Sequence, residues 1–251
     1  MKFRMPIICV LAVAVGALTS SGQAARPSET ADAERAAKVH SQLWHNNERE
    51  TIAKRLEKTT GNITVINDDD RNENDYAHQI QPPYPPLRMV EFACMSDAVV
   101  VGTPESGVSH MTADLGFVYS EWKLRITSVL QDNPKSPIIG GNEISVVRAG
   151  GTLTINGRSV IGKELNFPEF QPGDEYLLYL KYIPESGFYK AIAGRSFNLS
   201  HGPVPDAPYM DRSWDKVPVE ELLRDTKAAI SAAGTAAYCA RGRVTGRPCN
   251  L

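Results

Sequence analysis

Residues 118–130, which read VYSEWKLRITSVL, decide the fold class of this protein. Polar residues such as Lys123, Arg125 and Thr127 stand between apolar ones. The apolar positions of this stretch are Val118, Trp122, Leu124, Ile126 and Leu130. Successive side chains of a β-strand point to opposite faces, so this alternation predicts a strand with one buried and one solvated face. The length of the pattern is typical of a curved strand or of a strand in a barrel.

Strand patterns on both sides of this stretch extend the prediction to a sheet. Residues 98–102 form a compact β-branched run, residues 143–148 alternate, residues 176–183 are apolar on both faces, and residues 188–192 add another strand. Asn156-Gly157 separates two short strand patterns and predicts a type I′ hairpin, because this dipeptide accepts positive φ angles. Five or six strands in about 110 residues, without long helices between them, predict a mainly β fold, an antiparallel OB-like barrel.

The segments around the strands predict helices and a linker. Residues 26–60 show partial helical spacing, residues 61–81 are strongly polar, and the prolines of residues 82–86 favour extended geometry. A short helix is expected at residues 89–95, and a longer one begins after Pro218, packs on the barrel and ends at Gly234. We therefore predict a signal peptide at 1–24, a polar helical or disordered arm with a Pro-rich linker at 25–86, a β-barrel domain at 87–200, and a Pro-rich wrap, helix and Cys-containing tail at 201–251.

The first residues predict export from the cytoplasm. Lys2 and Arg4 precede an apolar run at residues 7–18, and the small residues Gly22 and Ala24 follow it. This is the pattern of a cleavable signal peptide with the cut after Ala24. The apolar run is shorter than the roughly 20 residues that a membrane-spanning helix needs. We expect a secreted or periplasmic protein with no stable membrane span after cleavage.

The charge of the mature chain argues against nucleic acid as a partner. Loss of residues 1–24 leaves 25 Lys and Arg against 29 Asp and Glu, a formal charge of −4. Binding to nucleic acid is driven by a positive field that releases counterions, and this protein lacks such a field.

Three cysteines remain after cleavage, and an oxidising compartment favours a disulfide between two of them. Cys239 and Cys249 are close in sequence, with glycines and a proline between them that let the chain turn back, so we predict this pair. The alternative pairs Cys94 with one of the tail cysteines. The Cys-x₂-Cys spacing of a zinc site is absent.

Three short motifs resemble those of a known group of secreted domains. They are SDAVVVG at residues 96–102, the predicted strand at residues 122–130, and PGDEYLLYL at residues 172–180. This order is similar to that in bacterial secreted barrel domains akin to the netrin-like modules of metalloproteinase inhibitors, over residues 89–195. The resemblance implies an OB-type barrel. The inhibitors use an N-terminal cysteine to chelate zinc, whereas the expected mature end here is Ala25, so their mechanism does not carry over.

The polar residues predict no catalytic site, no metal site and no cofactor. The five histidines are scattered, and the acidic run at residues 68–79 lacks the glycine and the bidentate glutamate of a calcium loop. Only folding can bring distant groups such as His110 and His201 together with a carboxylate.

Tyrosine provides the candidate binding site. If Tyr119, Tyr179 and Tyr189 lie on one exposed face, they form a recognition surface, because tyrosine joins apolar area to a polar tip.

These observations lead to a functional hypothesis and two other interpretations. The hypothesis is a non-enzymatic secreted or periplasmic module that binds a protein or another envelope component. The alternative is an extracytoplasmic hydrolase whose site is assembled only in the fold. A third interpretation makes residues 26–81 a tether for the barrel.

Overall fold

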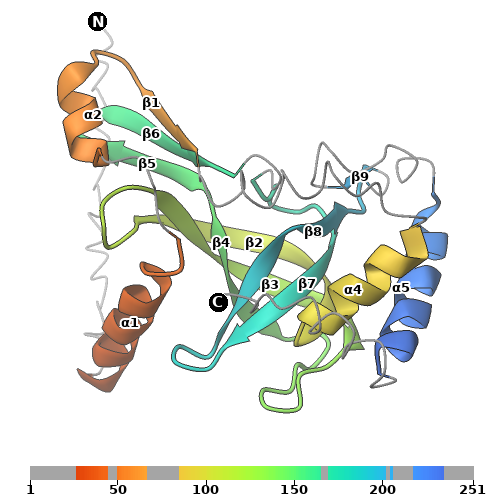
Figure 1. Ribbon diagram of the computed structural model, residues 1–251. Helices are drawn as coiled ribbons and strands as arrows, with labels where there is room; N and C mark the ends of the chain where they lie inside the picture. Colours follow the sequence, from red (N-terminus) through yellow and green to blue (C-terminus); the bar gives the residue numbers. More distant parts are fainter. Residues whose placement is uncertain are drawn as a thin grey trace, which may run out of the picture.

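The computed structural model of this protein describes residues 27–44, 50–66, 85–164, 169–201, 204–205 and 217–234. Figure 1 shows two sheets with helices around them. The larger sheet contains β2 (Ala98–Met111), β3 (Val118–Gln131), β4 (Glu143–Ala149), β7 (Tyr176–Ile183), β8 (Phe188–Asn198) and β9 (Val204–Pro205). The smaller sheet contains β1 (Ile63–Ile66), β5 (Gly151–Ile155) and β6 (Arg158–Lys163). The predicted mainly β class is confirmed.

Five strands of the larger sheet form a closed ring. They pair antiparallel in the order β4-β3-β2-β7-β8. A parallel pairing of β4 with β8, which places Val146 opposite Tyr189, closes the ring. Antiparallel strands throughout were expected from the sequence. The difference arises because side chains alternate in the same way in parallel and antiparallel strands, so the pattern does not encode strand direction.

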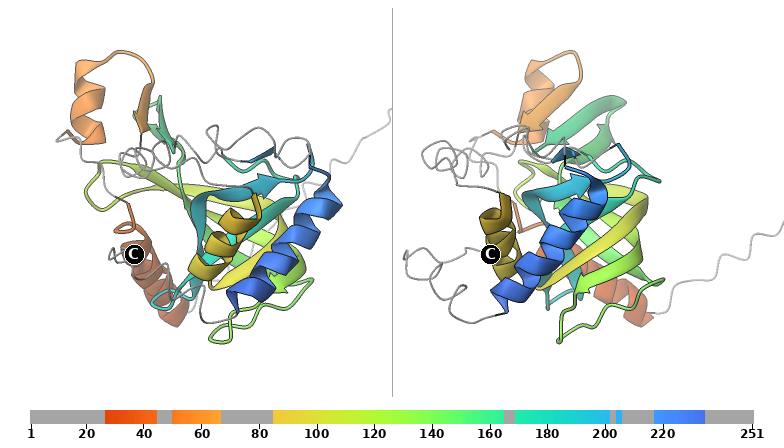
Figure 2. Two further views of the ribbon diagram at one scale, coloured as in Figure 1. Left: turned by 45° about the vertical axis from the view of Figure 1, so that its right-hand side comes forward. Right: turned by 90° about the vertical axis from the view of Figure 1, so that its right-hand side faces the viewer.

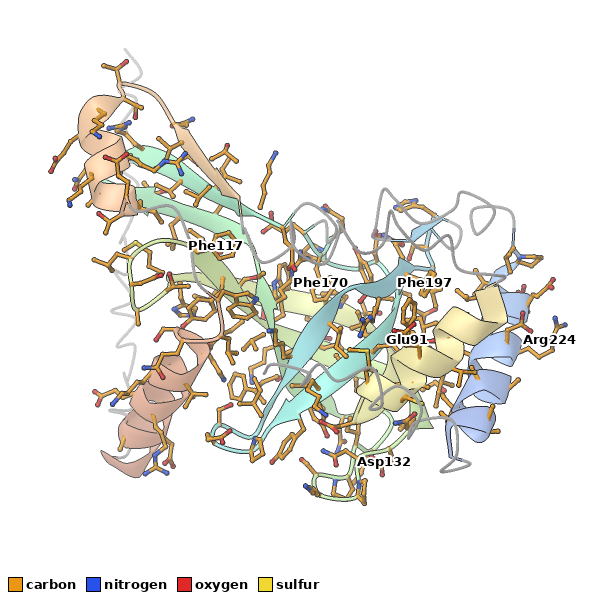
Figure 3. All side chains as sticks on the ribbon, viewed as in Figure 1. Glu91, Phe117, Asp132, Phe170, Phe197 and Arg224 are labelled. Carbon is orange, nitrogen blue, oxygen red and sulfur yellow. The ribbon has the colours of Figure 1, made fainter. Side chains whose placement is uncertain are left out.

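Both faces of the ring are packed. Leu178 and Leu180 of β7 belong to the cluster inside the ring, while Leu177 and Tyr179 belong to a second cluster outside it. Two helices, α4 (Pro85–Met95) and α5 (Val219–Ala233), cover the outer cluster and pack on each other. Figure 2 shows them side by side against the strands, and Figure 3 shows Arg224 on the outer face of α5. The strand at residues 176–183 and the helix after Pro218 are therefore confirmed. The other predicted helix is present but begins at Pro85, so Pro85 and Pro86 form its first turn and not an extended segment, because proline is tolerated in the first turn of a helix.

The predicted hairpin is also confirmed. Asn156 and Gly157 connect β5 to β6 and have φ angles of 52° and 74°. Gly162 of β6 packs so closely on β3 that a Cβ there would lie 2.7 Å from the Cβ of Val118. This contact joins the hairpin to the ring.

The N-terminal arm forms part of the core. Its helices are α1 (Pro27–His40) and α2 (Ile52–Lys58), and β1 follows them and pairs with β6 in parallel. Trp44, Ile52 and Val65 are buried in one cluster with Phe117 and Tyr119 of the ring side. The expected helical character is present, and the described residues of the arm also supply large apolar side chains to this cluster. A few large apolar side chains at wide spacing were enough to dock it.

Some predictions concern residues outside the described ranges. They are the signal peptide with its cut after Ala24, the pairing of Cys239 with Cys249, and the acidic run at residues 68–79, and all remain predictions. Cys94 lies in α4, partly buried against the outer cluster. Among the residues that the structure describes, no helix is both long and apolar enough to cross a bilayer.

Candidate functional site

The three tyrosines predicted to bind a partner are core residues. Tyr119, Tyr179 and Tyr189 are 1%, 0% and 2% exposed, and each belongs to a different apolar cluster. Tyr189 donates a hydrogen bond to the carbonyl of Ser136 at 2.7 Å. The exposed tyrosine surface that the sequence suggested is therefore not formed. Aromatic side chains fit both faces of a pleated sheet, and their spacing alone did not reveal that helices cover the outer one.

The two histidines named as possible hydrolase partners contact different carboxylates. Nε2 of His110 lies 3.8 Å from Glu121, and Nε2 of His201 lies 3.3 Å from Asp174. Among the described residues, the two histidines therefore share no carboxylate, and the predicted hydrolase site is not formed by this pair.

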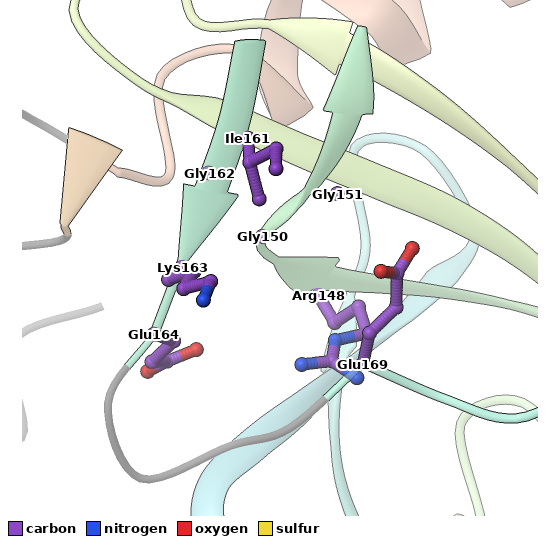
Figure 4. A pocket seen from close by; sticks show the side chains of 8 residues that line it. All are labelled: Arg148, Gly150, Gly151, Ile161, Gly162, Lys163, Glu164 and Glu169. Atoms are coloured by element: carbon purple, nitrogen blue, oxygen red, sulfur yellow. The ribbon is translucent and has the colours of Figure 1, made fainter. Parts of the chain in front are cut away.

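A cavity of about 310 Å³ lies where the ring meets the β5–β6 hairpin. Figure 4 shows Arg148 of β4 reaching into it, and Lys163 and Glu164 lining it from the end of β6. Glu169 and the glycines at 150, 151 and 162 complete the described lining together with Ile161. The volume is within the range of small-ligand sites.

Arg148 is the most deeply placed charged side chain of this cavity. It is 1% exposed, although it carries a permanent positive charge. Its Nε donates a hydrogen bond to the carbonyl of Ala149 at 3.1 Å, and its guanidinium lies 4.8 Å from the centre of the Phe170 ring. The buried Glu164 and the exposed Glu169 provide negative charge on the same cavity. The cavity is therefore lined by charged groups of both signs.

Two consecutive glycines form the corner between β4 and β5 that lines the cavity. Gly150 and Gly151 have φ angles of 89° and 142°, which L side chains rarely adopt, so the chain turns from β4 straight into β5. A Cβ at Gly151 would lie 2.5 Å from Oγ of Ser109, and one at Gly150 would lie 3.2 Å from the carbonyl oxygen of Gly162, so close packing excludes side chains at this corner. No local signal in the sequence places Arg148 beside a cavity.

A second polar arrangement joins the N-terminal arm to the ring. Nδ1 of His40 lies 2.6 Å from Oε1 of Glu121, and Nε2 of His40 lies 2.8 Å from Oγ of Ser186. His40 is fully buried and its ring lies 4.6 Å from that of Phe188. Tyr119 lies nearby, and burial, with a smaller contribution from Glu121, raises the pKa of Tyr119 to about 12. Neither Glu121 nor Ser186 was expected from the sequence to belong to a site.

The cavity and the His40 arrangement lie on opposite faces of the ring wall. Ser120 pairs with Arg148, and Glu121 pairs with Val147 in the next register position. Neighbouring residues of a strand point to opposite faces, so Arg148 and Glu121 serve different sites.

Comparisons with known proteins assign no family to either site. A scan against models of protein families gives no match, and a sequence comparison with curated proteins finds no relative. Within the described parts of the chain, no group of three or more His, Cys, Asp or Glu side chains is placed to hold a metal ion.

Proposed function

We propose that this chain is an exported binding module, secreted or periplasmic, that holds a charged group of a protein or of another envelope component in the cavity at Arg148. The observation that carries the proposal is a fully buried arginine at a cavity of about 310 Å³. A planar guanidinium is well suited to bind carboxylate or phosphate groups through paired hydrogen bonds. Glu169 at the exposed rim supplies opposite charge for the remainder of the ligand.

Affinity capture with tagged residues 25–251 tests the binding site. The chain and its Glu169→Lys variant are compared as bait for the native extracytoplasmic fraction. Because Glu169 is exposed, its replacement should leave the fold intact. Lys227→Glu on the exposed face of α5 is the matched control for a change of charge. We expect a partner that the parent and the control retain and that the Glu169 variant loses. Equal retention by all three proteins would remove the cavity as the binding site.

The export part of the proposal rests on the pattern of residues 1–24 and has its own test. N-terminal sequencing of the protein isolated from its native source should begin at Ala25. A mature protein that begins at Met1 would contradict export by a cleaved signal peptide.

A further inference from the structure

Three segments far apart in the chain bring Ser186, His40 and Glu121 together. His40 ends α1, Glu121 lies in β3, and Ser186 lies in the turn between β7 and β8. The imidazole lies between the other two groups, 2.8 Å from the hydroxyl of Ser186 and 2.6 Å from the carboxylate of Glu121. A nucleophile, a base and a third group that orients the base, each within hydrogen-bond reach, are the parts of an activated serine.

The hydrogen bonds determine where the protons lie. An ionised carboxylate only accepts, so Nδ1 of His40 carries the proton that faces Glu121. In the neutral imidazole Nε2 is then an acceptor, and the hydroxyl of Ser186 donates to it. The backbone N–H of Phe188 donates to Oγ of Ser186 at 3.4 Å, which leaves the hydroxyl proton for His40. This is the tautomer that a general base for serine requires.

The surroundings hold the base still and leave the serine accessible. His40 is 0% exposed and packs on the Phe188 ring, whereas Ser186 is partly exposed in its turn. The second carboxylate oxygen of Glu121 faces His110 at 3.8 Å. Solvent therefore reaches this group at Ser186 and at Glu121, whose side chain is 23% exposed, and not at His40.

We propose that Ser186 is a nucleophile for acyl transfer, with His40 as its general base and Glu121 as the residue that orients His40. The substrates are carboxylic esters with a good leaving group that reach the exposed turn. This activity goes beyond ligand binding and uses none of the residues that line the Arg148 cavity.

The reaction has two balanced steps. In the first, Oγ of Ser186 forms a bond to the carbonyl carbon while its proton passes to Nε2 of His40, and the bond from carbon to the leaving oxygen breaks as that oxygen takes the proton from His40. In the second, water attacks the acyl-serine, gives a proton to His40, and the proton returns to Oγ as the carboxylic acid leaves. The net reaction is ester plus water giving acid plus alcohol.

The experiment uses p-nitrophenyl acetate as substrate and a fluorophosphonate as covalent probe, both with the full mature chain. We expect release of p-nitrophenolate, and mass spectrometry should locate the fluorophosphonate on Ser186. In Ser186→Ala the rate should fall by about 100-fold or more, the usual contribution of such catalysis. Ser231→Ala, a change at an exposed serine of α5, should leave labelling and rate unchanged.

Glu121→Gln separates catalysis from a structural role of the same hydrogen bonds. Glutamine still bonds to His40, so the fold and the melting temperature should persist, but the neutral amide no longer stabilises the imidazolium and the labelling rate should fall. A chain that binds no probe at Ser186, or a Glu121→Gln variant that is labelled at the parent rate, overturns the proposal. His40 would then serve only to dock α1 on the ring.

Discussion

Burial decides what individual tyrosines of this protein do. Tyr179 lies between the ring and the two covering helices, in the same cluster as Phe92 of α4 and Leu222 of α5. Its hydroxyl is 3.4 Å from Oγ1 of Thr226. Burial raises its pKa from 10.0 to about 12, and the Thr226 contact opposes this only in part. The residue contributes to stability rather than to recognition.

This pKa shift predicts how stability depends on pH. An unfolded tyrosine releases its proton near pH 10, whereas folded Tyr179 keeps it until about pH 12. Below pH 10 the stabilisation is fully present. Between pH 10 and 12 the unfolded state binds fewer protons, so the free energy of unfolding falls with rising pH, by about 1.4 kcal/mol per pH unit for this group.

Urea unfolding at several pH values checks this prediction in Tyr179→Phe. The variant keeps the aromatic packing and lacks the titrating hydroxyl, so its free energy of unfolding should fall less steeply between pH 10 and 12 than that of the parent. Curves of equal slope would show that Tyr179 does not contribute to alkaline unfolding.

At the scale of elements, the hairpin is attached to the ring by close contact at Gly162. An added Cβ would meet the backbone oxygen of Val118 at 2.9 Å as well as its side chain. We expect Gly162→Ala to lower the free energy of unfolding by about 1–3 kcal/mol, the usual cost of overpacking. Gly61→Ala is the control, because nothing lies within 4 Å of its added Cβ. Denaturant unfolding that gives the same midpoint for both variants would contradict the contact.

Arg158 attaches the arm to the hairpin. Its guanidinium donates to the carbonyl of Gly61 at 3.0 Å and to Oγ1 of Thr59 at 2.7 Å, and to the carbonyl of Leu56 as well. These bonds end α2 and place β1 along β6. Hydrogen bonds from a charged group contribute about 1.5–3 kcal/mol each where they are not replaced by water.

Arg158→Ala should therefore release β1 without unfolding the ring. Hydrogen exchange, read by mass spectrometry, should become faster at residues 63–66 and stay slow in β2 and β7. Arg125→Ala, which removes an exposed ion pair with Glu105 on the ring, is the control and should leave exchange in β1 unchanged. Slow exchange at β1 in the Arg158 variant would show that the apolar contacts of the arm suffice.

At the scale of the whole molecule, the arm and the ring share one core. Figure 3 shows Phe117 near the junction of the two sheets, and this residue is 0% exposed. Trp44 stacks on Tyr119 with ring centres 5.6 Å apart, and the Lys190 ammonium lies 5.0 Å from the centre of the Trp44 ring. An arm that only tethered the ring would leave these aromatic side chains exposed.

Removal of residues 25–66 should consequently destabilise the ring. The deletion exposes Phe117, Tyr119 and Val160, so we expect a lower urea midpoint and binding of a hydrophobic dye such as ANS. Trp44→Ala, with an expected loss of about 3–5 kcal/mol, reports the same contact in the full chain. A deletion variant as stable as the parent would restore the interpretation of the arm as a tether.

Local patterns determined much of this fold from the sequence alone. Alternation predicted β3, the doubly apolar pattern of residues 176–183 predicted the central strand β7, and Asn156-Gly157 predicted the hairpin. The helix ending at Gly234 was also predicted. In each case the signal lies within a few neighbouring residues, because dihedral preferences and side-chain periodicity are local properties.

Only the tertiary structure decided the parallel closure of the ring, the burial of the tyrosines and the candidate sites. His40 lies 81 residues from Glu121 and 146 residues from Ser186, so no spacing rule joins them. In the sequence, Arg148 is only the last residue of a predicted strand. The cavity beside it forms when the β5–β6 hairpin packs against the ring. Local sequence therefore determined which segments form strands and helices, while packing between distant segments determined which polar groups meet, since side-chain chemistry alone does not encode distance.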